Sequence, residues 1–131
     1  MKKLIIVLIL MMVSSALAYN CKAEYNDDRL FPNTKFYTFE CDNNQKITFV
    51  AENNELVYFI RTTTANADFG NVEISKIEER ISIEETYNYE EAKVYDNFDV
   101  VISKEYNTIN KLSATNKLLN EWKRYKKFLK K

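Results

Sequence analysis

Three pairs of adjacent glutamates are the residues of this chain with the clearest potential for chemistry. They are Glu78-Glu79, Glu84-Glu85 and Glu90-Glu91. A glycosidase uses two carboxyl groups about 5–10 Å apart, one as acid and one as base or nucleophile. Neighbouring residues on a strand point to opposite faces, so the two members of a doublet do not share one cleft. We therefore expect the doublets to form a solvated acidic surface.

Other catalytic and ligand-binding groups are scarce. Histidine is absent from the whole chain, which removes the commonest general base and the commonest metal ligand. Gly70 is the only glycine, so a glycine-rich phosphate loop cannot be built. Asp96-Asn97-Phe98-Asp99 offers oxygen ligands but lacks the glycine and the bidentate glutamate of a twelve-residue calcium loop. The sequence predicts no enzyme, no cofactor and no metal site; an enzyme would need two carboxylates converging in one pocket.

Cys21 and Cys41 are the only cysteines. In an oxidising compartment an even pair closes, and a loop of about 20 residues would stabilise the fold by roughly 3 kcal/mol. Two buried free thiols are the alternative, and a redox-active pair is disfavoured because C-x-x-C spacing is absent. We expect a disulfide that fixes the N-terminal segment to the strand of Cys41 and leaves no thiol for catalysis or zinc.

Residues 1–18 have the order of a secretory signal peptide. Met1-Lys2-Lys3 is positive, Leu4 to Val13 is an apolar run, and Ala16-Leu17-Ala18 is a small-x-small cleavage site. About ten apolar residues are too few to span a bilayer, which needs roughly 20. We predict cleavage after Ala18 and a periplasmic or secreted product.

The same region allows two other interpretations. The first is an uncleaved membrane anchor over Leu4 to Ala18, which is short and is not followed at once by stop-transfer charges. The second is a lipoprotein modified at Cys21. We reject the second, because lipid attachment needs small residues directly before the cysteine, and Tyr19 and Asn20 stand there.

The segment after the polar Tyr19–Asn33 stretch predicts an antiparallel meander. Three β-forming runs, 35–41, 46–51 and 56–63, are separated by the turn signals 42–45 and 52–55. The alternation places three groups of side chains together on one side of each strand: Tyr37, Phe39 and Cys41; Ile47, Phe49 and Ala51; Leu56, Tyr58 and Ile60.

The middle of the chain is ambiguous. Residues 64–71 indicate a loop, and from Val72 onward odd-numbered apolar and aromatic residues favour long strands: Ile77, Ile81, Ile83, Tyr87 and Tyr89. The four-residue spacing of Ile77 and Ile81 also suits a helix. We predict strands with a break near 88–92, and a further strand containing Phe98, Val100 and Ile102.

Residues 107–131 have the pattern of an amphipathic helix. At 100° per residue an apolar stripe falls within roughly 140°: Leu112, Thr115, Leu118, Leu119, Trp122, Tyr125 and Leu129. Lys117, Lys123, Arg124, Lys127 and Lys131 lie opposite. Phe128 projects about 120° away from Trp122, off the stripe.

Together these elements predict one α+β domain over residues 19–131. We expect an antiparallel β-meander sheet of five to seven strands, covered by the C-terminal helix, with a small β-barrel carrying a C-terminal helix as the alternative. Charge is segregated: residues 19–106 carry 9 basic and 18 acidic side chains, whereas residues 107–131 carry 8 basic residues and one acid, Glu121.

The segregation suggests how the chain meets a partner. The helix either packs on the sheet with its lysines facing solvent or the acidic body, or packs there and also meets an anionic surface, or detaches to bind a membrane or protein. The candidate binding residues are Trp122, Lys123, Arg124, Lys126, Lys127, Phe128, Lys130 and Lys131.

For function we expect an exported, non-catalytic binding protein that recognises another protein as an inhibitor or accessory factor. The alternative is an envelope protein that associates with an anionic membrane surface through its basic helix. We expect no nucleic acid partner, because repulsion of phosphates by the acidic body would oppose attraction by the basic tail.

Overall fold

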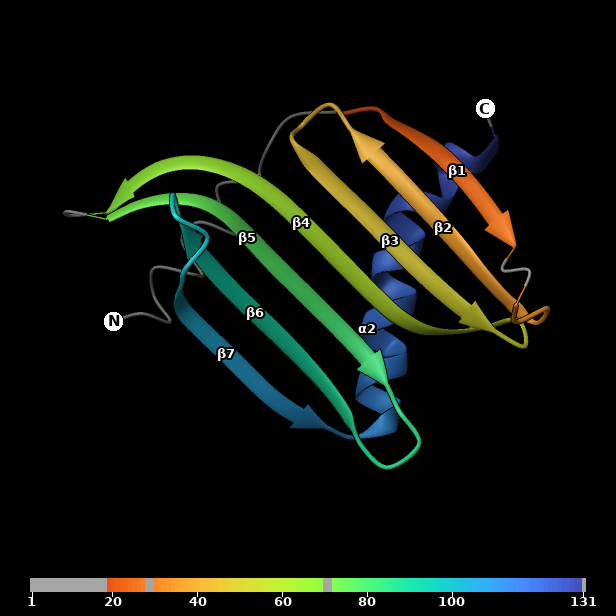
Figure 1. The fold of residues 1–131 in the computed structure, drawn as a ribbon. Helices are drawn as coiled ribbons and strands as arrows, with labels where there is room; N and C mark the ends of the chain where they lie inside the picture. The colour runs from red at the N-terminus through yellow and green to blue at the C-terminus, as the bar shows by residue number, and fades with distance from the viewer. Residues whose placement is uncertain (1–18, 28–29, 70–71, 131) are drawn as a thin grey trace.

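The computed structural model describes residues 19–27, 30–69 and 72–130; the predicted signal peptide, residues 1–18, lies outside the described residues. Seven antiparallel strands form one sheet in which each strand pairs with the next along the chain (Figure 1). The elements are β1 (Cys21–Asp27), β2 (Thr34–Cys41), β3 (Gln45–Glu52), β4 (Glu55–Phe69), β5 (Val72–Ile83), β6 (Asn88–Asp96), β7 (Val101–Ile109), the α-helix α2 (Lys111–Tyr125) and the 3₁₀-helix η1 (Lys126–Lys130).

The predicted α+β class is therefore confirmed. Within the described residues, β1 and β7 each pair with one strand only, so the sheet is open and the closed-barrel alternative is wrong. The helix α2 lies against one face of the sheet (Figure 1). We call the opposite side the open face.

The first two hairpins form where the sequence predicts them. Glu52 and Glu55 are paired across a turn whose two central residues, Asn53 and Asn54, have φ of 52° and 66°. Two consecutive positive φ values make the tight turn that matches the twist of antiparallel strands, and asparagine tolerates this conformation. Asn44 in the preceding turn also has positive φ, 64°.

A β-bulge changes the expected side of β4. Ala51 pairs with Leu56 and Val50 pairs with Tyr58, so Val57 is an extra residue in β4. Because one extra residue reverses the alternation, Leu56 packs toward the helix but Tyr58 and Ile60 do not. The predicted shared face of Leu56, Tyr58 and Ile60 is wrong: after the bulge the buried positions are Phe59, Arg61 and Thr63.

The middle of the chain consists of strands, with boundaries that differ from the prediction. Residues 64–69 belong to β4 rather than to a loop, and residues 70–71 of that predicted loop lie outside the described residues. The break falls at residues 84–87 rather than at 88–92. Phe98 and Val100 stand in the turn before β7 and are exposed, so only Ile102 of that predicted strand belongs to it.

The helix begins at Lys111 because Asn110 caps it: the Asn110 side chain accepts a hydrogen bond from the backbone N–H of Ser113 at 2.8 Å. Residues 107–109, predicted as helix, belong to β7. Leu112 stands in the first turn and is 71% exposed, so it is not part of the buried stripe.

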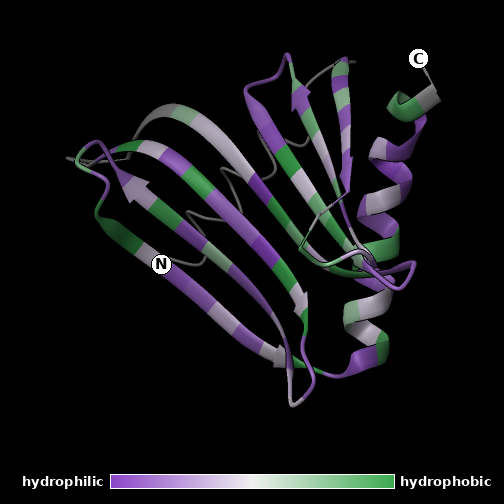
Figure 2. Ribbon diagram, turned by 45° about the vertical axis from the view of Figure 1, so that its right-hand side comes forward, coloured by the Kyte–Doolittle hydropathy of each residue, from purple (hydrophilic) through white to green (hydrophobic). Residues whose placement is uncertain are grey.

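The main core lies between α2 and the sheet. Phe39, Phe49 and Tyr125 are fully buried, with ring centroids 5.6–6.1 Å apart. Trp122 packs edge-on against this group, 5.1 Å from Phe49. Hydrophobic and hydrophilic residues alternate along the strands, as expected for a sheet with one covered face (Figure 2). A smaller cluster of Ile74, Ile77 and Val94 lies between β5 and β6.

The predicted disulfide is confirmed. Cys21 and Cys41 are bonded and stand opposite each other in the β1–β2 register. The bond fixes β1 to the remainder of the sheet. Tyr19, just before β1, contacts Tyr125 and Phe128 at centroid distances of 6.5 and 6.1 Å. The N-terminal segment thus closes over the end of the helix.

Among the described residues, no helix has both the length and the apolar character needed to cross a bilayer.

Candidate functional site

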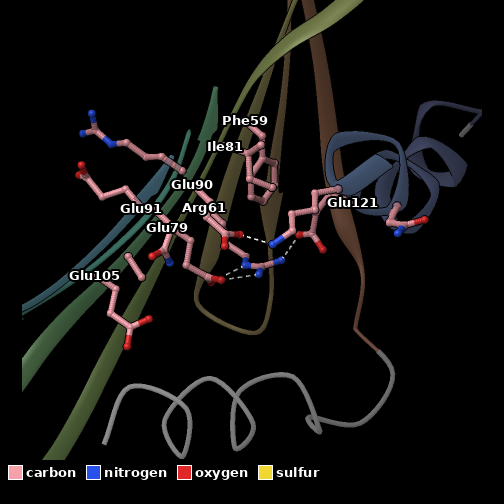
Figure 3. Close-up of a pocket in the computed structure, with 13 residues that line it drawn as sticks. Phe59, Arg61, Glu79, Ile81, Glu90, Glu91, Glu105 and Glu121 are labelled. Atoms are coloured by element: carbon pink, nitrogen blue, oxygen red, sulfur yellow. Dashed lines mark hydrogen bonds and ion pairs between the residues drawn. The ribbon is translucent and has the colours of Figure 1, made fainter. Parts of the chain in front are cut away.

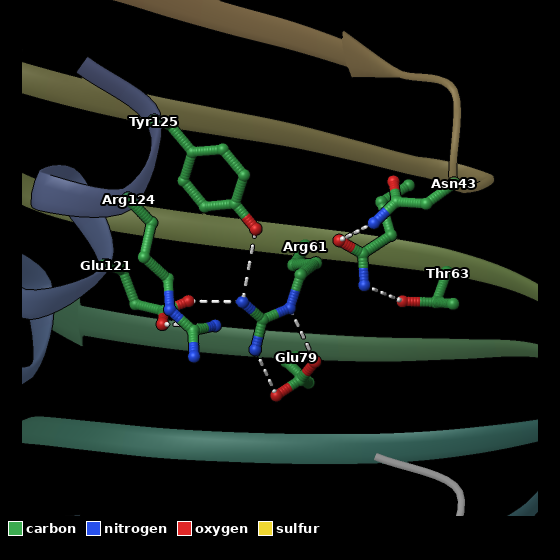
Figure 4. A network of polar contacts seen from close by, with 8 residues as sticks. Asn43, Arg61, Thr63, Glu79, Glu121, Arg124 and Tyr125 are labelled. Atoms are coloured by element: carbon green, nitrogen blue, oxygen red, sulfur yellow. Dashed lines mark hydrogen bonds and ion pairs between the residues drawn. The ribbon is translucent and has the colours of Figure 1, made fainter. Parts of the chain in front are cut away.

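An arginine stands at the centre of the interface between sheet and helix. Arg61 of β4 is buried and donates two hydrogen bonds of 2.8 Å to the two carboxylate oxygens of Glu79 on β5 (Figure 4). Its Nη1 pairs with Glu121 of α2 and donates to the Tyr125 hydroxyl at 3.4 Å. A bidentate arginine–carboxylate pair is a strong and directional contact. Arg61 therefore joins two strands and the helix.

The charges of this network are fixed by their surroundings. Burial alone would lower the pKa of Arg61, but the hydrogen bonds and charge of Glu79, with the charge of Glu121, outweigh it and raise that pKa. Burial raises the pKa of Tyr125 to about 12, against the opposing effect of Arg61. Near neutral pH the guanidinium is charged and the phenol is neutral.

A pocket of about 420 Å³ opens beside this network, between α2 and strands β4 to β7 (Figure 3). Its walls include the carboxylates of Glu79, Glu90, Glu105 and Glu121. Lys117 of α2 also lines the pocket and pairs with Glu90. The pocket is thus acidic and is partly neutralised from within.

The doublet predictions are correct only in part. The members of Glu78-Glu79 and Glu90-Glu91 point to opposite faces, but the predicted solvated surface is wrong there, because the side chains of Glu78, Glu79 and Glu91 are ion-paired and only 12%, 18% and 10% exposed. Both members of Glu90-Glu91 line the pocket, and both members of Glu84-Glu85 lie in the turn between β5 and β6. Glu79 faces the helix, while Glu78 pairs with Arg80 at 2.7 Å on the open face. Glu90 likewise pairs with Lys117 of the helix, while its neighbour Glu91 pairs with Lys93 at 3.1 Å. The sequence does not reveal that carboxylates from different strands gather here, because this depends on which strands pair.

Most carboxylates that line the pocket are already engaged in ion pairs. Glu79 and Glu121 are held by Arg61, and Glu90 is held by Lys117. Glu105 is the one wall carboxylate without an ion pair among the described residues. A glycosidase uses one carboxyl group as acid and a second as base or nucleophile, whereas Glu79, Glu90 and Glu121 here are each held in an ion pair. Within the described residues, no group of three or more acidic or cysteine side chains is placed to hold a metal ion.

The basic segment packs on the sheet, and its cations face solvent. Lys123, Arg124, Lys126 and Lys127 are exposed. Arg124 lies 3.5 Å from Glu121, one turn earlier on the helix. Lys130 is the last described residue, and Lys131 lies outside the described residues.

The two aromatic residues of the predicted binding segment are not exposed. Trp122 is half-buried, 4.9 Å from the Tyr37 ring. Phe128 is only 5% exposed and belongs to the main core, so its predicted projection away from the apolar stripe is wrong. The chain changes from α to 3₁₀ after Tyr125, and in a 3₁₀-helix residues three apart are aligned. Phe128 is thereby turned to the same side as Tyr125.

The open face carries an ordered row of tyrosines. Tyr87 and Tyr89 stack with centroids 5.7 Å apart, and Tyr89 stacks on Tyr106 of β7 at 5.2 Å. Tyr87 is 42% exposed and Tyr106 is 44% exposed. Lys104 lies 5.8 Å from the Tyr106 ring. We refer to Tyr87, Tyr89 and Tyr106 as the tyrosine row.

The sequence prediction placed Tyr87 and Tyr89 on the side of the buried isoleucines. The hairpin between β5 and β6 breaks that alternation: Ile81 pairs with Glu90, and Tyr89 pairs with Ser82 on the other face. The signal in the sequence for this row is the spacing of Tyr87 and Tyr89, two residues apart beside a turn.

Comparisons of the chain with family models, with curated proteins and with solved structures find no match.

Proposed function

We propose that this chain is an exported, non-catalytic binding protein that recognises another protein through the open face of its sheet, as an inhibitor or accessory factor. The observation that carries the proposal is the tyrosine row, three stacked rings on a face that no described element covers. Export rests on the predicted signal peptide and agrees with the disulfide, because such bonds persist outside the cytosol.

The surroundings of the tyrosine row have the composition of a protein interface. Tyrosine and arginine are enriched at interface centres, and tyrosine supplies large contact area at low cost in side-chain entropy. Arg80 of β5 and Glu91 of β6 lie on the same face and stand opposite each other in the strand register. Tyr106 stands opposite Glu91 on the next strand, so Arg80, Glu91 and Tyr106 form one row across β5, β6 and β7.

The helix is a weaker candidate for the contact. Leu112 and Leu119 remain exposed, but Leu118 and Tyr125 are already buried against the sheet, and so is Phe128. A partner or bilayer that used them would first have to separate the helix from the core. That step would expose Arg61 and its two carboxylates as well.

The test is affinity capture from the envelope and secreted fractions of the cells that produce the protein. The baits are the mature protein, the variant Tyr87→Ser/Tyr106→Ser, and the matched control Lys123→Gln/Lys127→Gln. We expect one specific partner on the first and third baits and its loss from the second. Capture of no specific partner by the wild type, or equal capture by the tyrosine variant, contradicts the proposal.

A second candidate function is association with an anionic membrane surface. It is favoured by the exposed cations at Lys123, Arg124, Lys126 and Lys127 on one side of the packed helix. Such binding would be electrostatic, since Phe128 is not free to insert. In vesicle co-sedimentation it should require anionic lipid, weaken with salt, and fall when all four cations become glutamine. Indifference to lipid charge rules it out.

A further inference from the structure

We infer that a second cavity, at the end of the sheet where α2 begins, binds a small amphipathic amine with its apolar part inside and its ammonium group at the rim. This cavity has a volume of about 860 Å³. Ligand-binding pockets occupy about 300–1,000 Å³, so a drug-sized molecule fits. The inference does not rest on the proposed protein partner, although the cavity adjoins the tyrosine row: Glu84 at its rim is hydrogen-bonded to Tyr87.

Three elements of the chain form the walls. The β3–β4 turn and the start of β4 contribute residues 54–57, the β5–β6 turn contributes residues 83–86 and Asn88, and α2 contributes Lys111, Thr115, Leu118, Leu119 and Trp122. The pairing of β4 with β5 begins only at Tyr58 and Ser82. Beyond that pair the two turns diverge, and the helix passes over the gap between them.

The inner wall is apolar. Leu56, Ile83 and Trp122 are half-buried there, and Leu118 is fully buried behind them. Leu119 remains 44% exposed at the edge. Apolar side chains that line a hollow without filling it can be covered by an aliphatic or aromatic group, and burying that group is favourable by area.

The rim is acidic. Glu55, Glu84 and Glu85 are exposed around the opening, and Lys111 is the one basic residue that lines it. The rim therefore attracts a cation. Glu84 also accepts a hydrogen bond from the Tyr87 hydroxyl, which raises the pKa of Tyr87. That contact holds one carboxylate of the rim in place.

Asn88 adds an acceptor that has no donor. Its Oδ1 is buried and accepts no hydrogen bond within the described part of the chain, although the residue lines the cavity. A buried acceptor without a donor is costly, but this oxygen is shielded from solvent, so a ligand in the cavity does not reach it as the side chain stands. An ammonium group has three N–H donors and no acceptor, so it suits the carboxylates of the rim.

Trp122 makes the test direct, because it is the only tryptophan in the chain and it lines the cavity. Its fluorescence is titrated with octylamine at pH 7, and with two controls: octanoate, which has the opposite charge, and butylamine, which has a shorter chain. We expect a saturable change with octylamine and binding at least about tenfold weaker for each control.

The rim is tested with the double variant Glu84→Gln/Glu85→Gln. It should weaken octylamine about fivefold or more, while the exposed pair Glu24→Gln/Glu40→Gln on β1 and β2 should leave the affinity unchanged. Circular dichroism checks that both variants are folded. If the rim variant fails to fold, the pH 7 ranking of octylamine, octanoate and butylamine with the wild type decides alone.

Three results would overturn the inference: no saturable change with octylamine, equal affinity for octanoate, or no loss in the folded rim variant. A change of Trp122 fluorescence on dilution without any amine would overturn it too, because a second copy of the chain would then cover the cavity. The affinity capture with the tyrosine variant tests the protein partner separately from these amine titrations.

Discussion

Arg61 of β4 and Glu121 of α2 form an ion pair that joins the middle of the sheet to the helix across 60 residues of sequence. Glu121 is the only acidic residue of the basic C-terminal segment, and Arg61 is the buried cation of the acidic body. Lys117 and Glu90 form a second link of the same kind. The acidic body and the basic C-terminal segment are thus joined by ion pairs where the helix meets the sheet.

Replacing Arg61 by methionine should destabilise the fold strongly. The change leaves Glu79 and Glu121 partly buried without their cation, and breaking one partner of a buried ion pair costs about 3–5 kcal/mol. Urea unfolding measures the difference in free energy of unfolding. The control is Arg80→Met: Arg80 is 33% exposed, against 10% for Arg61, and it has one acidic partner instead of two, so its loss should cost less. Similar losses in the two variants would contradict a central role for Arg61.

Removing the disulfide should loosen the N-terminal strand first. The bond closes a loop with a sequence separation of 20 residues, worth roughly 3 kcal/mol in the chain-entropy model. The variant Cys21→Ser/Cys41→Ser should show faster hydrogen exchange in β1 and in η1, which Tyr19 contacts through Phe128. Exchange in β7 serves as the internal comparison and should rise less than exchange in β1. Uniform loss of protection over all strands would show that the bond stabilises the whole sheet equally.

Replacing Phe128 by alanine should cost about 3 kcal/mol or more, because a buried aromatic ring leaves a cavity. Its neighbour Lys127 is exposed, and Lys127→Ala should change the free energy of unfolding by less than about 0.5 kcal/mol. Thermal and urea unfolding of the two variants settle which side of the segment faces the core. If Phe128→Ala left the free energy of unfolding unchanged, Phe128 would be exposed, as the projection of a continuous α-helix predicts.

Stability should fall at alkaline pH through Tyr125. Burial raises the pKa of its hydroxyl to about 12, above the value near 10 of an unfolded chain. The stabilising contribution is therefore complete below pH 10 and is lost as the pH rises toward 12. Tyr125→Phe should flatten the fall in melting temperature between pH 10 and 12. The control is Tyr25→Phe: the pKa of Tyr25 is also raised to about 12, by its hydrogen bond to Asp27, but its ring is exposed and solvent screens the effect.

Local pattern was sufficient for much of the fold. Alternation placed Ile47, Phe49 and Ala51 on one side of a strand, and all three are buried. The asparagine-rich turns and the cysteine pair were read correctly for the same reason, since each depends on residues near in sequence or on a single compatible partner.

The predictions of which side chains face the core are wrong where the strand alternation or the helical repeat changes locally. The extra residue Val57 reverses which side chains of β4 face the helix, and no residue type in this segment predicts a bulge. The change from α to 3₁₀ after Tyr125 moves Phe128 by about 20° per residue relative to a continuous α-helix. Three such steps turn it from the solvent side toward the core.

The candidate sites depend on long-range pairing, which a single sequence does not display. The two carboxylates of Arg61 come from β5 and α2, and the cavity below Trp122 is formed by two hairpin turns and a helix. The sequence gives one signal for this site: Arg61 follows apolar residues within a β-forming run, and a buried arginine needs acidic partners.

Photo-crosslinking in the producing cells tests the central claim, recognition of a protein through the open face, most directly. A photoreactive phenylalanine analogue is placed at Tyr106 in the tyrosine row and, in a matched variant, at Lys127 on the exposed side of η1. The account predicts one discrete protein adduct from position 106 and none from position 127. An adduct from position 127 alone, or no protein adduct from position 106, would contradict it.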